Sequence, residues 1–207
     1  KVNLSVPSLR ADNFSMGLMH RLQKGRKAGL TFAPEAGTQR LRDAINKNLT
    51  EEDLHQSLRT AFSGGWNAVK LYFMLGLPTE TDEDVLAIAV LVYKIILKWK
   101  EFGSAKKRGL RIHVATAFFV PKPHTPFQWE KQITMEEYLR RCMLLKSHFY
   151  SKSIDYNYHT PEISRLESVM ARGDRRIAPV IAEAARNGAK LDGWDEYFKH
   201  EAWISAF

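Results

Sequence analysis

The sequence predicts an α/β protein whose strands are parallel. Short apolar runs alternate along the chain with amphipathic helical patterns, and this alternation implies right-handed βαβ crossovers. Two of the runs, 29–38 and 69–80, stop at turns that contain Gly, Pro and a carboxylate. Parallel α/β folds bind ligands at the C-terminal ends of their strands. Function is therefore expected at these turns.

The first half of the chain is predicted to be regular. We expect strands at Val2–Val6, Leu30–Ala33 and Val69–Leu75, and helices at Met16–Lys24, from Thr38 to about Asn46, from Thr50 to Gly64 and from Thr81 through Trp99. Thr50 and Thr81 are good N-cap residues, and the acidic residues after each suit the positive end of a helix. The apolar run of the third strand is typical of a strand covered on both faces.

The second half begins with a strand and continues mostly as helices. We expect strands at Leu110–Val120 and Ile154–Tyr158, and helices from Thr134 to about Tyr150 and from Thr160 to Gly173. Pro179 either starts the next helix or kinks it. The aromatic residues between Trp194 and Phe207 predict a docking segment that covers the core.

The charge of the chain raises the question of a nucleic-acid partner. Its formal net charge is +8 over 207 residues, with a pI near 9.6. The densest basic run, 106–108, lies in a predicted linker, and no base-stacking consensus accompanies it. We therefore interpret the charge as a solvated surface, and an RNA partner stays open.

The cysteine content and hydropathy limit the class of protein. Cys142 is the single cysteine, which excludes an internal disulfide and a cysteine-only metal site within the chain. Its spacing from Tyr138 and Leu145 places it on an apolar helix face. No apolar stretch is long enough to span a bilayer and no signal peptide is present, so we expect a cytoplasmic protein without a membrane partner. The chain begins with Lys1 rather than Met, which suggests a piece of a longer polypeptide.

The turn after the second predicted strand offers a candidate ligand site. A carboxylate such as Glu35, directly after a strand, can accept two hydrogen bonds from a ribose diol. Gly37 allows the backbone to approach a ligand closely, and Thr38 stands at a helix N-terminus. The alternative is a solvated loop carboxylate followed by a routine helix cap.

Other strand ends add weaker candidates. Gly76 removes a side chain where a flat ring could lie, and the segment 118–127 offers exposed backbone and apolar contact. Past the first strand, Arg10 can pair with a carboxylate ligand or with a nearby acidic residue. His124 and His159 are interpreted as loop histidines.

Four segments of the chain together resemble the radical S-adenosylmethionine (radical SAM) enzymes. The segments 29–42 and 70–81 resemble the fourth-strand segment of that family and its fifth-strand Gly-Leu-Pro-x-Glu-Thr segment. The segments 120–129 and 171–176 resemble a largely uncharacterised subgroup in which a cobalamin-binding-like region precedes the radical SAM domain. The resemblance covers nearly the whole chain.

The resemblance implies a partial (βα)6 TIM-type barrel. Residues 1–130 would form the C-terminal part of the barrel, strands three to six, and 131–207 a helical extension that packs on it. The three-cysteine loop that holds a 4Fe–4S cluster in the family would lie outside this chain, and Cys142 cannot replace it. The chain alone would be inactive, and no metal ligand is expected in it.

The resemblance also assigns roles to individual residues, all of them cofactor contacts. The catalytic residues stay unknown. The residues expected at S-adenosylmethionine are Ser8 or Arg10 at the methionine carboxylate, Glu35 at the ribose, Gly37 and Thr38 in the turn that admits the nucleoside, Met74, Leu75 and Gly76 beside the adenine, and the backbone of Phe119 and Val120 at its edge.

The function implied by the resemblance belongs to an intact enzyme. With its cluster and an electron donor, such an enzyme would cleave S-adenosylmethionine to a 5′-deoxyadenosyl radical that abstracts hydrogen from a substrate. The substrate is unknown, RNA is one option, and the use of cobalamin by an upstream region is open. Two alternatives remain: a cluster-free TIM-type enzyme that uses Glu35 or His124 in acid–base catalysis, or a basic RNA-binding module without catalysis.

Overall fold

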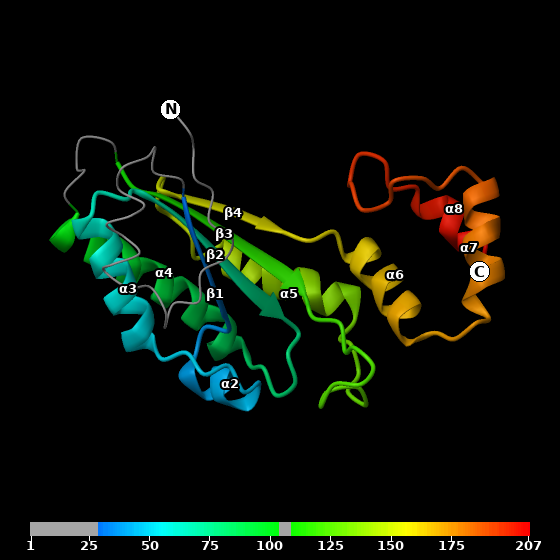
Figure 1. The fold of residues 1–207 in the computed structure, drawn as a ribbon, viewed down its shortest axis with the longest axis horizontal. Coiled ribbons are helices and arrows are strands. Elements are labelled where there is room, and N and C mark those ends of the chain that lie inside the picture. The colour runs from blue at the N-terminus through cyan, green and yellow to red at the C-terminus, as the bar shows by residue number, and fades with distance from the viewer. Residues whose placement is uncertain (1–28, 104–108) are drawn as a thin grey trace. The chain divides into compact units, whose positions relative to one another are not determined.

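The computed structural model describes residues 29–103 and 109–207 (Figure 1). The predicted strand Val2–Val6, the predicted helix Met16–Lys24 and the candidate residues Ser8 and Arg10 lie outside the described residues. Strands and helices alternate through most of the described chain. Their order is β1 (Leu30–Glu35), α2 (Gln39–Ala44), α3 (Glu51–Ser63), β2 (Ala68–Leu75), α4 (Asp82–Phe102), β3 (Arg111–Phe118), α5 (Met135–Lys146), β4 (Ile154–Tyr158), α6 (Pro161–Arg172), α7 (Ile177–Arg186) and α8 (His200–Ile204).

The strands form one four-stranded sheet in the order β1-β2-β3-β4. β1 pairs with β2 in parallel, and β3 pairs with β4 in parallel. Because α4 crosses over between β2 and β3, neighbours in the same sheet, that pair is parallel as well. The predicted α/β class with a parallel sheet is confirmed, and each strand lies beside the strand that precedes it in sequence.

Predicted helix starts agree with the structure. Thr50 begins α3 and Thr81 begins α4, each in a capping box with an aspartate three residues later, Asp53 and Asp84. The helix expected to reach Tyr150 ends earlier, at Lys146. There the side chains of Ser147 and His148 both bond to the carbonyl oxygen of Leu144, at 2.8 and 2.9 Å, and so compete with the continuing helix.

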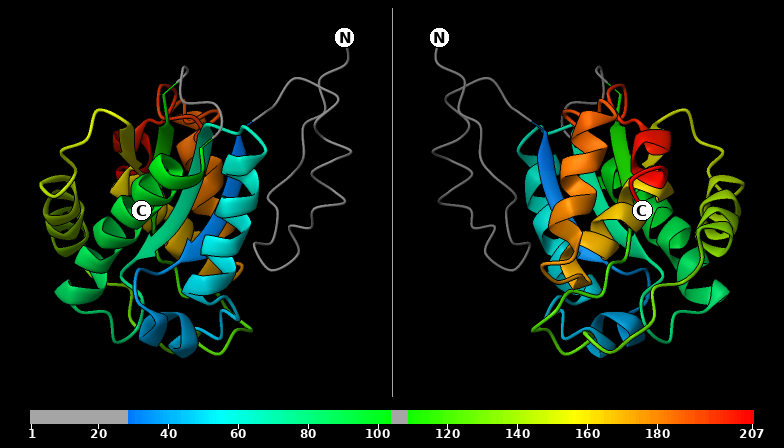
Figure 2. Two further views of the ribbon diagram at one scale, coloured as in Figure 1. Left: turned by 90° about the vertical axis from the view of Figure 1, so that its left-hand side faces the viewer. Right: turned by 90° about the vertical axis from the view of Figure 1, so that its right-hand side faces the viewer.

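One face of the sheet is covered by helices α3 and α4, which lie side by side on it (Figures 1 and 2). Along β2, Val69, Leu71 and Phe73 are buried, whereas the alternate residues Lys70 and Tyr72 are exposed. The expectation of a strand covered on both faces was therefore wrong for β2. The prediction failed because the exposed face of β2 also carries large apolar residues, such as Tyr72, so the strand has an almost continuous apolar run.

The chain divides into two compact units. The first holds the described residues of 29–75, 79–117 and 141–158, and the second holds 76–78, 118–140 and 159–207. The division of the chain at residue 130 into barrel and extension stays a prediction. Within the described residues, no helix is long and apolar enough to cross a membrane.

The second unit has a small core of its own between α6, α7 and α8. Ala184, Ala202 and Trp203 are buried in it, and Phe198 packs against them partly buried. Trp194 and Phe207 are 62% and 60% exposed, so the expectation that the aromatic tail covers a core was wrong for much of its length. The short helix α8 buries Ala202 and Trp203, whereas Trp194 and Phe207 lie outside it.

Candidate functional site

The candidate residues from the sequence are distributed over both units. Those of the first unit are Glu35, Gly37, Thr38, Met74 and Leu75; those of the second are Gly76, Phe119 and Val120. In the first unit, the parallel pairing of β1 and β2 brings their C-terminal ends to the same edge of the sheet, as the sequence predicted.

The end of β1 is irregular in a way that its sequence explains. Phe32 pairs with Leu71 and Glu35 pairs with Phe73, so β1 has one residue more than β2 over this stretch. Pro34 lies inside the irregularity and has no N–H to donate to the ladder. Such bulges change the direction of the strand and of the side chain that follows.

Glu35 ends β1 with a backbone φ of 69°. This left-handed conformation is uncommon for residues other than glycine and is often found at functional sites. The Glu35 side chain is 25% exposed, and its Oε1 accepts a hydrogen bond of 3.2 Å from the Nζ of Lys47. In the described structure its Oε2 has no protein partner. The carboxylate is thus oriented by one cation and retains acceptor capacity.

Gly37 is buried against the start of α4. A Cβ atom at this position would lie 2.5 Å from the carbonyl oxygen of Asp84 and 2.5 Å from the amide nitrogen of Ile88. These are backbone atoms of a helix and cannot move aside locally. Close packing of the β1–α2 turn on α4 therefore already requires glycine here, and a nucleoside contact at Gly37 stays a prediction.

Thr38 is the N-cap of α2, as predicted, and also bonds to α4. Its hydroxyl accepts from the backbone N–H of Leu41 at 3.2 Å and donates to Asp84. Asp84 is 2% exposed and also accepts from Arg40 and from the backbone N–H of Thr81, the latter at 2.9 Å. Although burial by itself raises the pKa of the Asp84 carboxyl, these hydrogen bonds outweigh it and hold that pKa below its ordinary value.

A buried guanidinium fixes the turn from inside. Arg42 is 2% exposed, and its Nη1 donates to the carbonyl oxygens of Ala36 and Gly37 at 3.0 and 3.1 Å. Its Nε donates to the carbonyl oxygen of Leu49 at 3.1 Å. Burial lowers the pKa of Arg42, while the carboxylate of Glu51 acts in the opposite direction. The turn after Glu35 is therefore held from inside by several hydrogen bonds to one side chain.

Sequence reasoning missed Asp84 and Arg42 as parts of this site. The Thr81-x-x-Asp84 spacing announces a capping box, but nothing in it shows that the carboxylate also binds residues near position 38. An arginine on an amphipathic helix is ordinarily assigned to the surface. Only the tertiary structure shows that Arg42 points inward.

At the end of β2, Met74 is half-buried and Leu75 is buried. Gly76 follows in the second unit with a φ of 88°, a conformation that favours glycine. A Cβ atom on Gly76 would lie 2.9 Å from the side chain of Ile133. Within that unit the Ile133 side chain therefore occupies the space that a side chain at position 76 would need. The adenine contact at Gly76 stays a prediction.

The predicted backbone contact at Phe119 has a protein partner in the second unit. The carbonyl oxygen of Phe119 accepts from the side-chain amide of Gln132 at 3.2 Å, and its ring meets Phe127 edge to face at 6.0 Å. Val120 is 8% exposed. An adenine edge at this backbone would share it with Gln132.

The histidines and the cysteine occupy different environments. His124 lies in an exposed loop with a φ of 60°, and His159 is exposed next to α6. Cys142 is buried on α5, as predicted. Among residues 29–103 and 109–207, no cluster of three or more His, Cys, Asp or Glu side chains could hold a metal ion.

Comparison with known proteins gives a relative but no family. No protein-family model matches the chain. The chain is 32% identical over 180 residues to the uncharacterized protein MJ0966 of Methanocaldococcus jannaschii. The aligned region is 87% of this chain and 37% of that protein, so the chain spans little more than a third of the relative's length.

Proposed function

We propose that this chain is the C-terminal part of a radical SAM domain and binds the nucleoside of S-adenosylmethionine at its strand ends. The observation that carries the proposal is the position of Glu35. Its carboxylate follows β1 at the edge where β2 also ends, and it is oriented by Lys47. The sequence resemblance assigns the ribose contact to this same residue.

The strand order supports a barrel-type arrangement. In a doubly wound sheet the order reverses at a switch point, whereas strands of a (βα) barrel follow one another around the axis. The order β1-β2-β3-β4 has no reversal. A partial (βα)6 barrel would continue this order in both directions.

The chemistry of Glu35 suits a ribose diol. An ionised carboxylate has two oxygens with about four acceptor positions, and Lys47 uses one of them. The side chain is partly exposed, so a ligand can reach it. The bonds of Arg42 and Asp84 hold the following turn, which lowers the cost of ordering the site when a ligand binds.

The described residues do not fit a 4Fe–4S cluster. Such a cluster needs several thiolates, and the single cysteine, Cys142, is buried on α5. Any cluster ligands must come from outside this chain. The role proposed for the chain is to bind and orient the nucleoside.

The test uses a longer natural polypeptide that includes the sequence upstream of residue 1, purified anaerobically with iron and sulfide. We expect saturable binding of S-adenosylmethionine by calorimetric titration and release of 5′-deoxyadenosine upon reduction. The Cys142→Ala variant should retain the iron content of the wild type. Absence of S-adenosylmethionine binding would overturn the proposal. Loss of iron in Cys142→Ala would overturn the exclusion of this cysteine.

A further inference from the structure

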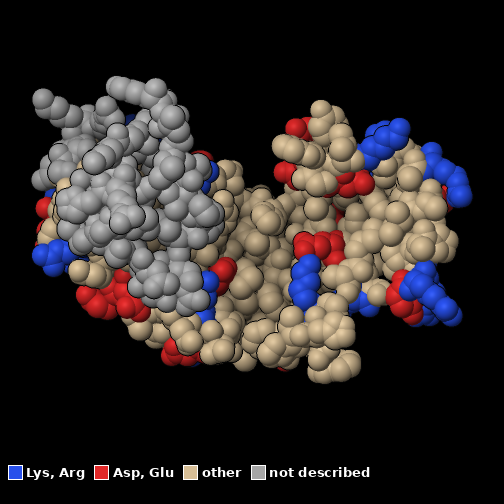
Figure 3. Space-filling view, viewed as in Figure 1, with Lys and Arg blue, Asp and Glu red and all other residues tan. Residues whose placement is uncertain are grey.

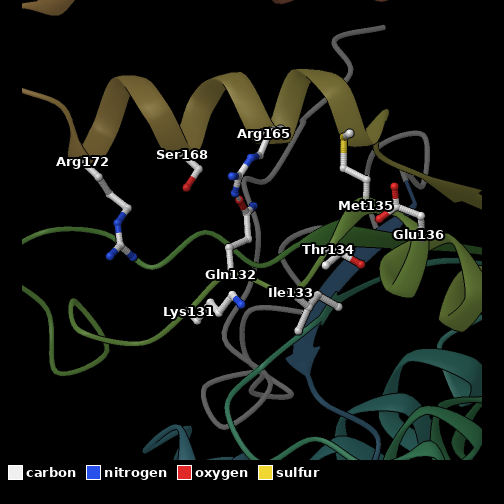
Figure 4. A pocket seen from close by; sticks show the side chains of 9 residues that line it. All are labelled: Lys131, Gln132, Ile133, Thr134, Met135, Glu136, Arg165, Ser168 and Arg172. Carbon is white, nitrogen blue, oxygen red and sulfur yellow. Dashed lines mark hydrogen bonds between the residues drawn. The ribbon is translucent and has the colours of Figure 1, made fainter.

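The second unit contains a cavity outside the proposed nucleoside site. It has a volume of about 430 Å³ and lies between α6 and the loop that leads into α5 (Figure 4). A volume in this range accommodates a small organic ligand. The part of its lining used below consists of Lys131, Gln132, Glu136, Arg165, Ser168 and Arg172.

One face of α6 directs polar side chains into this cavity. Arg165, Ser168 and Arg172 are spaced by three and four residues, so they share a face of the helix. Figure 4 shows all three side chains directed from α6 toward the loop that carries Lys131 and Gln132. The cavity therefore receives positive charge from both of its sides.

Each arginine is positioned by one hydrogen bond and retains further donors. The Nη1 of Arg165 donates to the Oε1 of Gln132 at 3.2 Å, and the Nη1 of Arg172 donates to the carbonyl oxygen of Glu130 at 2.9 Å. Within the described residues, neither guanidinium forms an ion pair with a carboxylate. A guanidinium has five N–H donors, so most of them remain available to a ligand.

The acidic group at the cavity has its own hydrogen bonds. Glu136 lies in the first turn of α5. Hydrogen bonds from its own backbone N–H and from the Thr134 hydroxyl lower the pKa of the Glu136 carboxyl, so it is ionised at neutral pH. Three cationic side chains and one carboxylate leave the lining with an excess of positive charge.

Ser168 adds a hydroxyl group to the lining of the cavity. The residue is 5% exposed, and its hydroxyl is not among the buried polar atoms that lack a partner within the described residues. A hydroxyl at a cavity wall can donate one hydrogen bond to a ligand. In Figure 4 it points into the cavity between the two arginines.

We propose that this cavity binds a phosphate group. Guanidinium groups match phosphate oxygens in a fork geometry, and a serine hydroxyl donates one further hydrogen bond. The volume leaves room for the remainder of a nucleotide beyond its phosphate. S-adenosylmethionine carries no phosphate, so this site is independent of the proposed nucleoside site.

The source of the phosphate is either a mononucleotide or the backbone of an RNA. On the part of the second unit that Figure 3 shows, Lys and Arg side chains form separate small groups rather than one continuous stripe. An RNA bound mainly through phosphates would show a steep dependence of affinity on salt, whereas a mononucleotide would show a shallow one. The two sources are therefore distinguished by experiment.

The test is calorimetric titration of the 207-residue chain with inorganic phosphate, AMP and a short single-stranded RNA at two salt concentrations. We expect at least one phosphate-bearing probe to bind saturably with one site per chain. Arg165→Gln combined with Arg172→Gln should weaken that binding about tenfold or more, and Ser168→Ala several-fold. Arg165→Lys should recover less than half of the lost binding free energy, because lysine lacks the fork.

The control is Arg186→Gln, which makes the same kind of substitution once, in the same unit but outside the cavity. Arg186 lies on α7, paired with Glu183 at 2.5 Å and outside the cavity. The affinity of the Arg186→Gln variant for the phosphate-bearing probe should stay within twofold of the wild type. Circular dichroism of each variant should match the wild type, since both cavity arginines are exposed. Absence of saturable binding by every probe, or equal losses in the control, would overturn the proposal.

Discussion

A Cβ atom on Gly37 would lie 2.5 Å from the carbonyl oxygen of Asp84. The turn that follows Glu35 is therefore pressed against the first turn of α4, and the Thr38 hydroxyl bonds to the Asp84 side chain beside this contact. Because the proposed ribose contact depends on the shape of this turn, we expect changes in its packing on α4 to alter ligand binding as well.

The first prediction concerns that close contact. Gly37→Ala should lower the free energy of unfolding by about 3 kcal/mol, because the added methyl group meets helix backbone rather than a flexible side chain. Urea denaturation followed by circular dichroism measures the loss. Gly193→Ala is the control: nothing lies within 4 Å of its Cβ position, and its effect should stay within about 0.5 kcal/mol. Equal effects would contradict the contact.

The second prediction concerns the pH dependence contributed by Asp84. Its folded-state pKa is lowered relative to the unfolded chain, where an aspartate has a pKa of about 3.9. The stabilisation is therefore present above about pH 4 and is lost as the pH falls through the folded-state pKa. Asp84→Asn should be less stable than the wild type by about 2 kcal/mol at pH 7. The difference should shrink steadily in urea titrations below about pH 4, and a constant difference would contradict the linkage.

The third prediction concerns an ion pair between α5 and the loop before α4. The Nη1 of Arg141 lies 2.5 Å from the Oε2 of Glu80, whose side chain is only 2% exposed. Glu80→Gln removes the carboxylate charge that faces Arg141 in a buried setting, so we expect a loss of about 2–3 kcal/mol. Glu101→Gln breaks an exposed pair with Lys98 and should cost less than about 1 kcal/mol. Thermal unfolding of both variants tests the difference.

The fourth prediction concerns Glu35. Glu35→Gln replaces a charged acceptor with a neutral amide, and S-adenosylmethionine affinity in the longer polypeptide should fall about tenfold or more. The variant should lose less than about 1 kcal/mol of stability, since its pair with Lys47 is partly exposed.

Lys47→Gln is the matched control for Glu35. It removes the same ion pair but keeps the carboxylate, so calorimetry should show a clearly smaller loss of affinity than in Glu35→Gln. Unchanged affinity for S-adenosylmethionine in Glu35→Gln would show that Glu35 is a solvated loop carboxylate without a role in ligand binding. Equal losses in both variants would assign the effect to the ion pair rather than to the ribose contact.

Local patterns in the sequence sufficed for most of the described fold. The alternation of apolar runs with helical periods predicted the parallel sheet, and Thr50 and Thr81 predicted two helix starts. The burial of Cys142 followed from helical spacing alone. These features depend on neighbours within a few residues, which is why they can be read from the chain.

The environment of the candidate site was decided by the tertiary structure. That Gly37 packs on α4 and that Arg165, Ser168 and Arg172 line a cavity with residues 131–136 both depend on segments far apart in sequence. No local period encodes such contacts, because they arise when separate elements compete for the same space and for the same hydrogen-bond partners. The sequence by itself determined where strands end and which polar residues stand there; only the tertiary structure decided which of those residues are held by packing and which remain accessible to a ligand.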